Sequence, residues 1–188
     1  MKVCQYGVYD FIPDGLIPEA RVALTLNPAE LTAHWRRCSL ISDFAAGYIA
    51  SAFSPASKMR QSDIFNSVST ITQELIENAA KFSLQRDSVV DVELLHFDRL
   101  FAFSIKNTAS SAVALEFEQH IQTLLTAQDL DSMYVDILEK RRDNESRSGI
   151  GLLLLMKDHG LKLGVRFSED TVGKTTISVR AIYFLGDE

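Results

Sequence analysis

Three polar residues, Glu74, Asn78 and Lys81, are spaced so that a helix places them on one face. The apolar residues of the same stretch fall largely on another face: Leu75, Ile76, Ala79 and Phe82. A carboxylate, a carboxamide and an ammonium are thus aligned. Because asparagine is a modest helix former and its carboxamide oxygen is a hard ligand suited to magnesium, its place in mid-helix points to a chemical role.

An ordinary structural reading of this helix stays open beside the chemical one. Amphipathic helices usually carry glutamate and lysine on their solvated face, and Glu77 with Lys81 has the spacing of a helical ion pair. Other motifs in the chain are needed to distinguish a chemical site from an ordinary solvated helix face.

A second candidate lies at Gly149-Ile150-Gly151, which precedes the apolar run that starts at Leu152. The first turn of a helix offers unpaired N–H groups and a positive dipole end to a phosphate, and glycines let the backbone come close. The alternative is a flexible loop in which Ser148 caps the helix. A lone pair of glycines does not separate these alternatives.

The bulk composition bounds the class of protein. With 188 residues, 46% of them apolar, the chain fits one domain with a real core, and its net charge of −6 argues against duplex nucleic acid as a partner. Two distant cysteines, the lack of a signal-peptide pattern and the lack of an 18-residue apolar run predict a cytoplasmic protein without a membrane span. The four histidines show no metal-ligand spacing.

The periodicity predicts an α+β fold, a two-layer α/β sandwich with helices on one face of a mainly antiparallel sheet. Residues 1–58 are expected to form two strands and one long helix, from Asn27 to Phe53, that pack on a core formed by residues 59–188 of a single compact domain. Asn27 is expected to cap that helix, and Glu30 completes a capping-box-like pattern with it. The apolar stripe of that helix suits either a core or a homodimer surface. The core is expected to contain a helix at 60–84, weaker helical patterns within 112–142, a helix that starts at about Leu152 and stops at Gly160, and strands at 89–97, 100–107, 163–168 and 175–184. Asp98-Arg99 is expected to join the first two of these strands in a tight antiparallel hairpin.

The order of these motifs resembles the ATP-binding fold shared by gyrase, Hsp90 chaperones, histidine kinases and MutL, including the anti-sigma-factor serine kinases. The likeness covers about residues 60–185: residues 74–81 look like the N box, 148–152 like the second glycine box, and 173–176 like the closing motif. It implies ATP or ADP with Mg²⁺ as the ligand. By resemblance, Asn78 holds the metal, Glu74 is the catalytic base and Lys81 approaches the phosphates.

The same resemblance assigns the remaining binding positions. The backbone of the second glycine box cradles the phosphates, and the closing motif contributes Thr175; the glycine-box residues are Ser148, Gly149, Ile150, Gly151 and Leu152. Asn107 stands where the family's first glycine box, DxGxG, has the aspartate that accepts from the adenine amino group. Ala109 and Ser111 add Cβ atoms where glycine is usual, which predicts weaker nucleotide binding.

A looser similarity over nearly the whole chain points to SiaB-type bacterial kinases. It rests on Pro28, Trp35-Arg36, Ser42-Asp43-Phe44 and Tyr48, together with the later glycine motifs. The resemblance implies a serine/threonine kinase of a partner-switching system that phosphorylates a small regulatory protein. The degenerate adenine box favours the alternative, a pseudokinase of the same fold that sequesters partners without ATP. A histidine kinase fragment is disfavoured because His34 is followed by Trp35.

Overall fold

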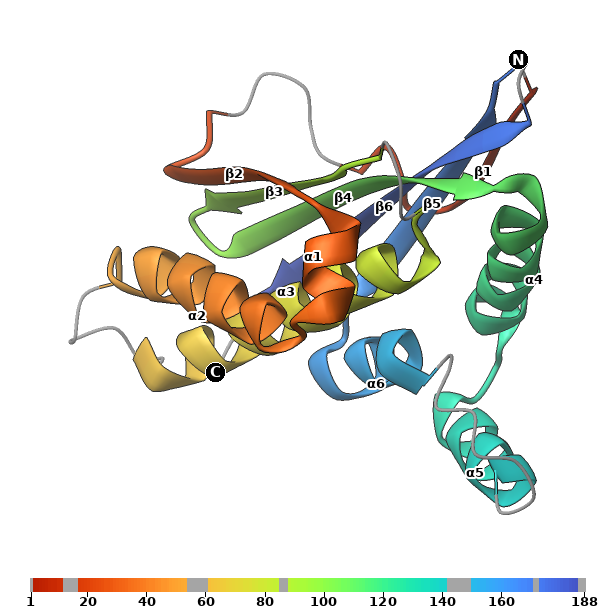
Figure 1. Cartoon of the computed structure of the whole chain (residues 1–188). Coiled ribbons are helices and arrows are strands. Elements are labelled where there is room, and N and C mark those ends of the chain that lie inside the picture. Colours follow the sequence, from red (N-terminus) through yellow and green to blue (C-terminus); the bar gives the residue numbers. More distant parts are fainter. Residues whose placement is uncertain are drawn as a thin grey trace.

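The molecule is a two-layer α/β sandwich, in which helices cover one face of an antiparallel sheet (Figure 1). The computed structural model describes residues 2–11, 17–53, 61–84, 88–141, 150–170 and 173–185. In chain order its elements are β1 (Lys2–Gly7), β2 (Ala20–Leu26), α1 (Pro28–Ala33), α2 (Arg36–Ala50), α3 (Gln61–Phe82), β3 (Val90–Phe97), β4 (Leu100–Ser110), α4 (Ser111–Thr126), α5 (Leu130–Arg141), α6 (Ile150–His159), β5 (Lys162–Glu169) and β6 (Lys174–Phe184). Within these residues the strand order is β1-β5-β6-β4-β3-β2.

The expected strands form where side chains alternate between a buried and a more accessible face. In β6, Ile177, Val179 and Ala181 are buried, whereas the residues between them are partly accessible. The β3–β4 hairpin turns at Asp98-Arg99, as predicted, and Asp98 takes a positive φ of 45°. The apolar face of the sheet therefore points toward the helices and forms the core with them.

The two N-terminal strands occupy opposite edges of the sheet. β1 pairs with β5, and β2 pairs with β3, in both cases antiparallel. Strands β1 and β2 thus complete the sheet on both sides.

The prediction of one long helix from Asn27 to Phe53 is wrong, because the chain breaks at His34 into α1 and α2. His34 leaves the helical region, with φ −139° and ψ 68°. The predicted cap is confirmed, since Asn27 accepts from the backbone N–H of Ala29 at 2.9 Å. Glu30 does not complete a capping box; its carboxylate pairs with Arg37 across the break.

Helix α3 lies at the centre of the helical layer. It packs on α2 on one side and contacts α6 and β4 on others. Its buried side chains run along the whole helix: Ile64, Val68, Ile71, Leu75, Ile76 and Ala80. The weaker helical patterns are confirmed as α4 and α5, and Gly160, with φ 61°, ends α6 as expected.

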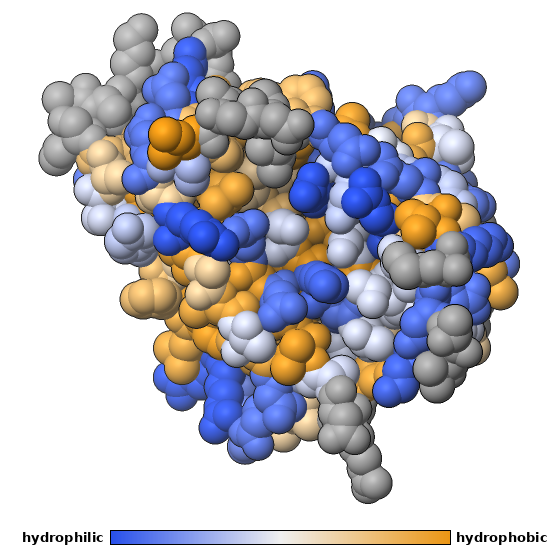
Figure 2. Space-filling model, turned by 90° about the horizontal axis from the view of Figure 1, so that it is seen from above, coloured by the Kyte–Doolittle hydropathy of each residue, from blue (hydrophilic) through white to orange (hydrophobic). Residues whose placement is uncertain are grey.

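The face of the sheet away from the helices carries a mixture of hydrophilic and hydrophobic side chains (Figure 2). Tyr9 packs on this face, where the guanidinium carbons of Arg166 and Arg180 lie 4.1 and 4.6 Å from the centroid of its ring. Arg180 also donates to the carbonyl of Tyr9 at 3.1 Å. This layer is possible because Gly164 has no side chain: an added Cβ would lie 2.3 Å from the Tyr9 nitrogen.

In the part of the chain that the structure describes, no helix combines the length and the apolar character that crossing a membrane requires.

The close approach at Gly164 yields a stability prediction. Gly164→Ala forces a Cβ into backbone atoms of Tyr9, which cannot move aside as a side-chain end does, and we expect a loss of roughly 1–3 kcal/mol. Gly47→Ala, in helix α2, is the matched control. Its added Cβ would meet only the ring of Phe65, at an ordinary van der Waals distance of 3.8 Å. That control should gain up to about 1 kcal/mol. Urea denaturation measures both, and equal midpoints for the two variants contradict the prediction.

Candidate functional site

Two of the three polar residues of α3 lie against the start of α6. A Cβ built on Gly151 would stand 2.1 Å from Oε2 of Glu74 and 3.6 Å from Nδ2 of Asn78. Any side chain at position 151 would therefore displace the Glu74 carboxylate. The acid and the amide of α3 meet the glycine of α6, which is far from them in sequence, where the two helices are in contact.

The Glu74 carboxyl lies in a partly desolvated position. Burial raises its pKa above the usual value, and the nearby carboxylate of Glu77 raises it further. Glu77 itself accepts a hydrogen bond from Gln73 at 2.8 Å. A carboxyl with a raised pKa holds a proton more firmly, which is a property of general bases that work near neutral pH.

Lys81 does not join this group. Its side chain is exposed, and its ammonium lies 5.3 Å from the ring centroid of Phe82. The lysine therefore sits one turn beyond Asn78, at the C-terminal end of α3.

A small cavity separates α3 from the sheet, and we call it the Asn78 cavity. Its volume is about 20 Å³, room for roughly one water molecule. It is lined by Leu75, Asn78, Ala79, Phe82, Ile105, Asn107, Phe117, Leu152, Ile177 and Val179. Phe117 of α4 stacks on Phe82 at a centroid distance of 5.8 Å, so aromatic rings fill much of the space between α4 and α3.

Two carboxamides in the Asn78 cavity are not satisfied. The Nδ2 groups of Asn78 and Asn107 are buried without a hydrogen-bond partner in the structure. An unpaired buried amide costs free energy unless something binds it, so the two groups mark a place for a polar ligand.

The segment that resembles the first glycine box is part of a strand. β4 continues to Ser110, pairing Asn107 with Ile177 and Ser110 with Lys174 of β6, and Ser110 then caps α4. Residues with Cβ atoms at 109 and 111 suit this extended strand and helix start. The chain therefore has no glycine loop at this point, and α4 begins where such a loop would lie.

The other residues of the predicted site are dispersed. Leu152 is buried in the core, and Ile150 begins α6. Ser148 and Gly149 lie outside the described residues. Thr175 is buried, with 5% of its surface exposed. It lines a different cavity, between α4 and the strands β1, β5 and β6.

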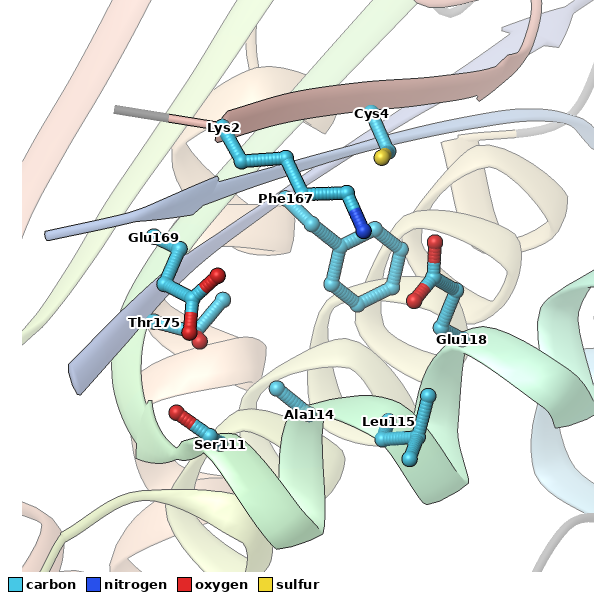
Figure 3. Close-up of a pocket in the computed structure, with 9 residues that line it drawn as sticks. All are labelled: Lys2, Cys4, Ser111, Ala114, Leu115, Glu118, Phe167, Glu169 and Thr175. Carbon is cyan, nitrogen blue, oxygen red and sulfur yellow. The ribbon is translucent and has the colours of Figure 1, made fainter. Parts of the chain in front are cut away.

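This second space, which we call the Glu118 cavity, measures about 200 Å³ (Figure 3). It is lined by Lys2, Cys4, Ser111, Ala114, Leu115, Glu118, Phe167, Glu169 and Thr175. No motif in the sequence marks this cavity, because its residues come from three distant parts of the chain. The cross-strand pairing of β1 with β5 is what brings them together.

The Asn78 cavity is too small to hold a nucleotide in this conformation, since its volume is about 20 Å³. The unpaired Nδ2 groups of Asn78 and Asn107 offer N–H donors to a polar ligand, whereas a cation at Asn78 would bind the carboxamide oxygen. Among the described residues no three histidine, cysteine, aspartate or glutamate side chains are grouped to hold a metal ion. A magnesium ion at Asn78 would therefore need oxygens from phosphates and water, which is its common coordination in nucleotide sites.

Comparison with known proteins does not add a family assignment. None of the known protein-family models matches this chain. No curated protein matches it either.

Glu74 gives a prediction on the pH dependence of stability. Because its pKa is raised in the folded state, ionisation at neutral pH costs stability, and that cost disappears as the pH falls toward the ordinary glutamate value of about 4.3. Glu74→Gln should raise Tm at pH 7 by about 1–3 °C, with a smaller gain at pH 4.5. Glu116→Gln, at an exposed position of α4, is the control. Thermal unfolding in which the gain grows toward acid pH contradicts this account.

Proposed function

We propose that the chain is a bacterial signalling regulator with a histidine-kinase-like ATP-binding site, and that it phosphorylates serine or threonine of a small partner protein. The observation that carries this proposal is the contact of Gly151 with Glu74 and Asn78. The resemblance to the N box and the second glycine box requires this meeting of α3 with α6. A solvated amphipathic face does not require it, because Glu74 and Asn78 would then point to water.

The residues have distinct roles in this proposal. ATP with Mg²⁺ supplies the phosphoryl group when bound. Asn78 offers its carboxamide oxygen to the cation, Asn107 accepts from the base, and the backbone at Gly151 lies close enough to orient phosphates. Glu74, with its raised pKa, takes the proton of the partner's hydroxyl. Catalysis of this kind rests on placement and charge.

The proposal requires α4 to move. A cavity of about 20 Å³ is much too small for a nucleotide, and Phe117 of α4 lines it. Helix α4 follows β4 directly and precedes α5, so it stands where ATP-binding folds of this kind carry a lid. Displacement of Phe117 opens the space between Asn78 and Asn107, and nucleotide affinity is reduced by the free energy of that opening.

The filled cavity favours a second candidate, a pseudokinase that binds partners without ATP. In that case the stacked Phe82 and Phe117 rings are permanent parts of the core. The two candidates share the fold, the cytoplasmic setting and a regulatory partner, with SiaB-like partner switching as the proposed pathway type. Nucleotide binding separates them.

Substitution of Asn78 tests the kinase proposal. Isothermal titration with ATP and Mg²⁺ should show binding by the unmodified protein and at least about tenfold weaker binding by Asn78→Ala, since a ligand oxygen and a polar contact are lost. The variant should keep its Tm, because the amide it removes is buried without a partner. Asn66→Ala, at an exposed position of the same helix, is the control. If the unmodified protein shows no heat of binding with millimolar ATP, the kinase proposal is wrong and the pseudokinase is the remaining candidate.

Gly151→Ala separates binding from folding. The added methyl group displaces the end of the Glu74 side chain, which is flexible, while alanine favours the helix by up to about 1 kcal/mol. We therefore expect an unchanged or higher Tm together with loss of nucleotide binding and phosphoryl transfer. Gly47→Ala serves as the control, since it adds the same methyl group to α2 far from the site. A Gly151→Ala protein that binds ATP normally contradicts the assigned role of the contact.

A further inference from the structure

We propose that the Glu118 cavity binds a short aliphatic diamine, with one ammonium at Glu118, the other at Glu169, and the methylene chain over the ring of Phe167. This inference concerns a space separate from the Asn78 cavity. It does not depend on nucleotide binding or on kinase activity.

Strand register explains why these groups converge. Lys2 is opposite Glu169 and Cys4 is opposite Phe167 in the β1–β5 pairing, and Glu169 is opposite Thr175 in the β5–β6 pairing. Cross-strand neighbours share one face of a sheet. Their side chains point toward α4, which closes the cavity with Glu118, as Figure 3 shows.

The carboxylate of Glu118 is held in place by neighbouring polar groups. The hydroxyl of Tyr6 donates to its Oε1 at 2.6 Å, and Gln122 donates to that hydroxyl at 2.8 Å. The hydrogen bond to Glu118 also raises the pKa of Tyr6, which keeps the hydroxyl protonated as a donor. One carboxylate oxygen is thus engaged, and the other is available to a ligand with N–H groups.

The middle of the cavity is apolar. Phe167 is 5% exposed, and Ala114 and Leu115 line the α4 side. Figure 3 shows Glu118 and Glu169 on opposite sides of the cavity with the ring of Phe167 between them. Negative ends with an apolar centre match a molecule that has a cation at each end of a methylene chain, since ammonium groups and CH₂ groups are both attracted to a phenyl face.

The chain itself supplies one ammonium to this space. The Lys2 side chain enters the cavity in Figure 3, and it is exposed to solvent on a flexible stem. Two carboxylates face this single cation, so the lining keeps an excess of negative charge. A diamine satisfies both carboxylates and displaces Lys2 toward water, and a volume of about 200 Å³ suits a ligand of four or five carbons better than a nucleotide.

Cys4 provides a direct readout of occupancy. Its thiol lines the cavity, whereas Cys38 is fully buried and burial raises the pKa of its thiol to about 11. A small neutral thiol reagent, methyl methanethiosulfonate, therefore labels Cys4 selectively in the folded protein. The two ligands tested are 1,4-diaminobutane and n-butylamine, compared at the same ionic strength. Mass spectrometry follows the rate at which the reagent labels Cys4.

We expect saturating 1,4-diaminobutane to slow the labelling of Cys4 at least about fivefold. The half-protecting concentration of n-butylamine should be at least about tenfold higher than that of the diamine, because the monoamine engages only one carboxylate. Glu118→Gln and Glu169→Gln should each raise the half-protecting diamine concentration about tenfold, while Lys2→Met should lower it. Gln at 118 can still accept from Tyr6, so the fold is kept. Glu116→Gln, on the same helix outside the cavity, is the control and should change nothing.

Three results would each overturn the proposal. The first is unchanged labelling at 20 mM diamine, a concentration above the usual KM range of roughly 1 μM to 1 mM. The second is equal protection by the monoamine, and the third is equal effects of Glu116→Gln and Glu118→Gln. Calorimetric titration of the diamine into the Cys4→Ser variant repeats the test without the thiol. Failure of ATP binding leaves this inference untouched, and failure here leaves the proposed kinase site untouched.

Discussion

The contact of α6 with α3 at Gly151 is the constraint on which the candidate site depends. Helix α3 buries apolar residues against α2 and the sheet, which leaves Glu74 and Asn78 facing α6. A side chain larger than hydrogen at position 151 would separate the two helices or displace the carboxylate. Close packing therefore accounts both for the partly desolvated acid and for the unpaired amide in the cavity beneath it.

Helix α4 forms a wall of both cavities. Phe117 lines the Asn78 cavity, and Glu118, the next residue, lines the Glu118 cavity. Phe117 also contacts Phe167 at a centroid distance of 6.0 Å, so the rings form a continuous partition. If the proposed ligands bind, one that fixes α4 in one cavity would change the free energy of opening the other, which is the physical requirement for linkage between two sites.

Local chemistry made much of the fold predictable from the sequence. The Asn27 cap, the Asp98-Arg99 turn and the alternation in β6 follow from side-chain type and period, and they appear as expected. The break at His34 was not predictable, because the apolar stripe continues across it while the backbone turns. The contact of Glu74 with Gly151 agrees with the resemblance, which places the N box and the second glycine box at one site. The Glu118 cavity had no sequence signal, since strand pairing alone creates it.

The placement of β1 also bears on how the chain reaches its native state. This strand and its partner β5 are far apart in sequence, since Lys2 pairs with Glu169 and, among the described residues, three other strands and six helices lie between them in chain order. During synthesis from the amino terminus, β1 has no edge to join until β5, which follows α6, has been made. Loop closure over such a separation is slow, so docking of β1 is expected to be a late step, and the wall that holds Lys2 and Cys4 is completed last.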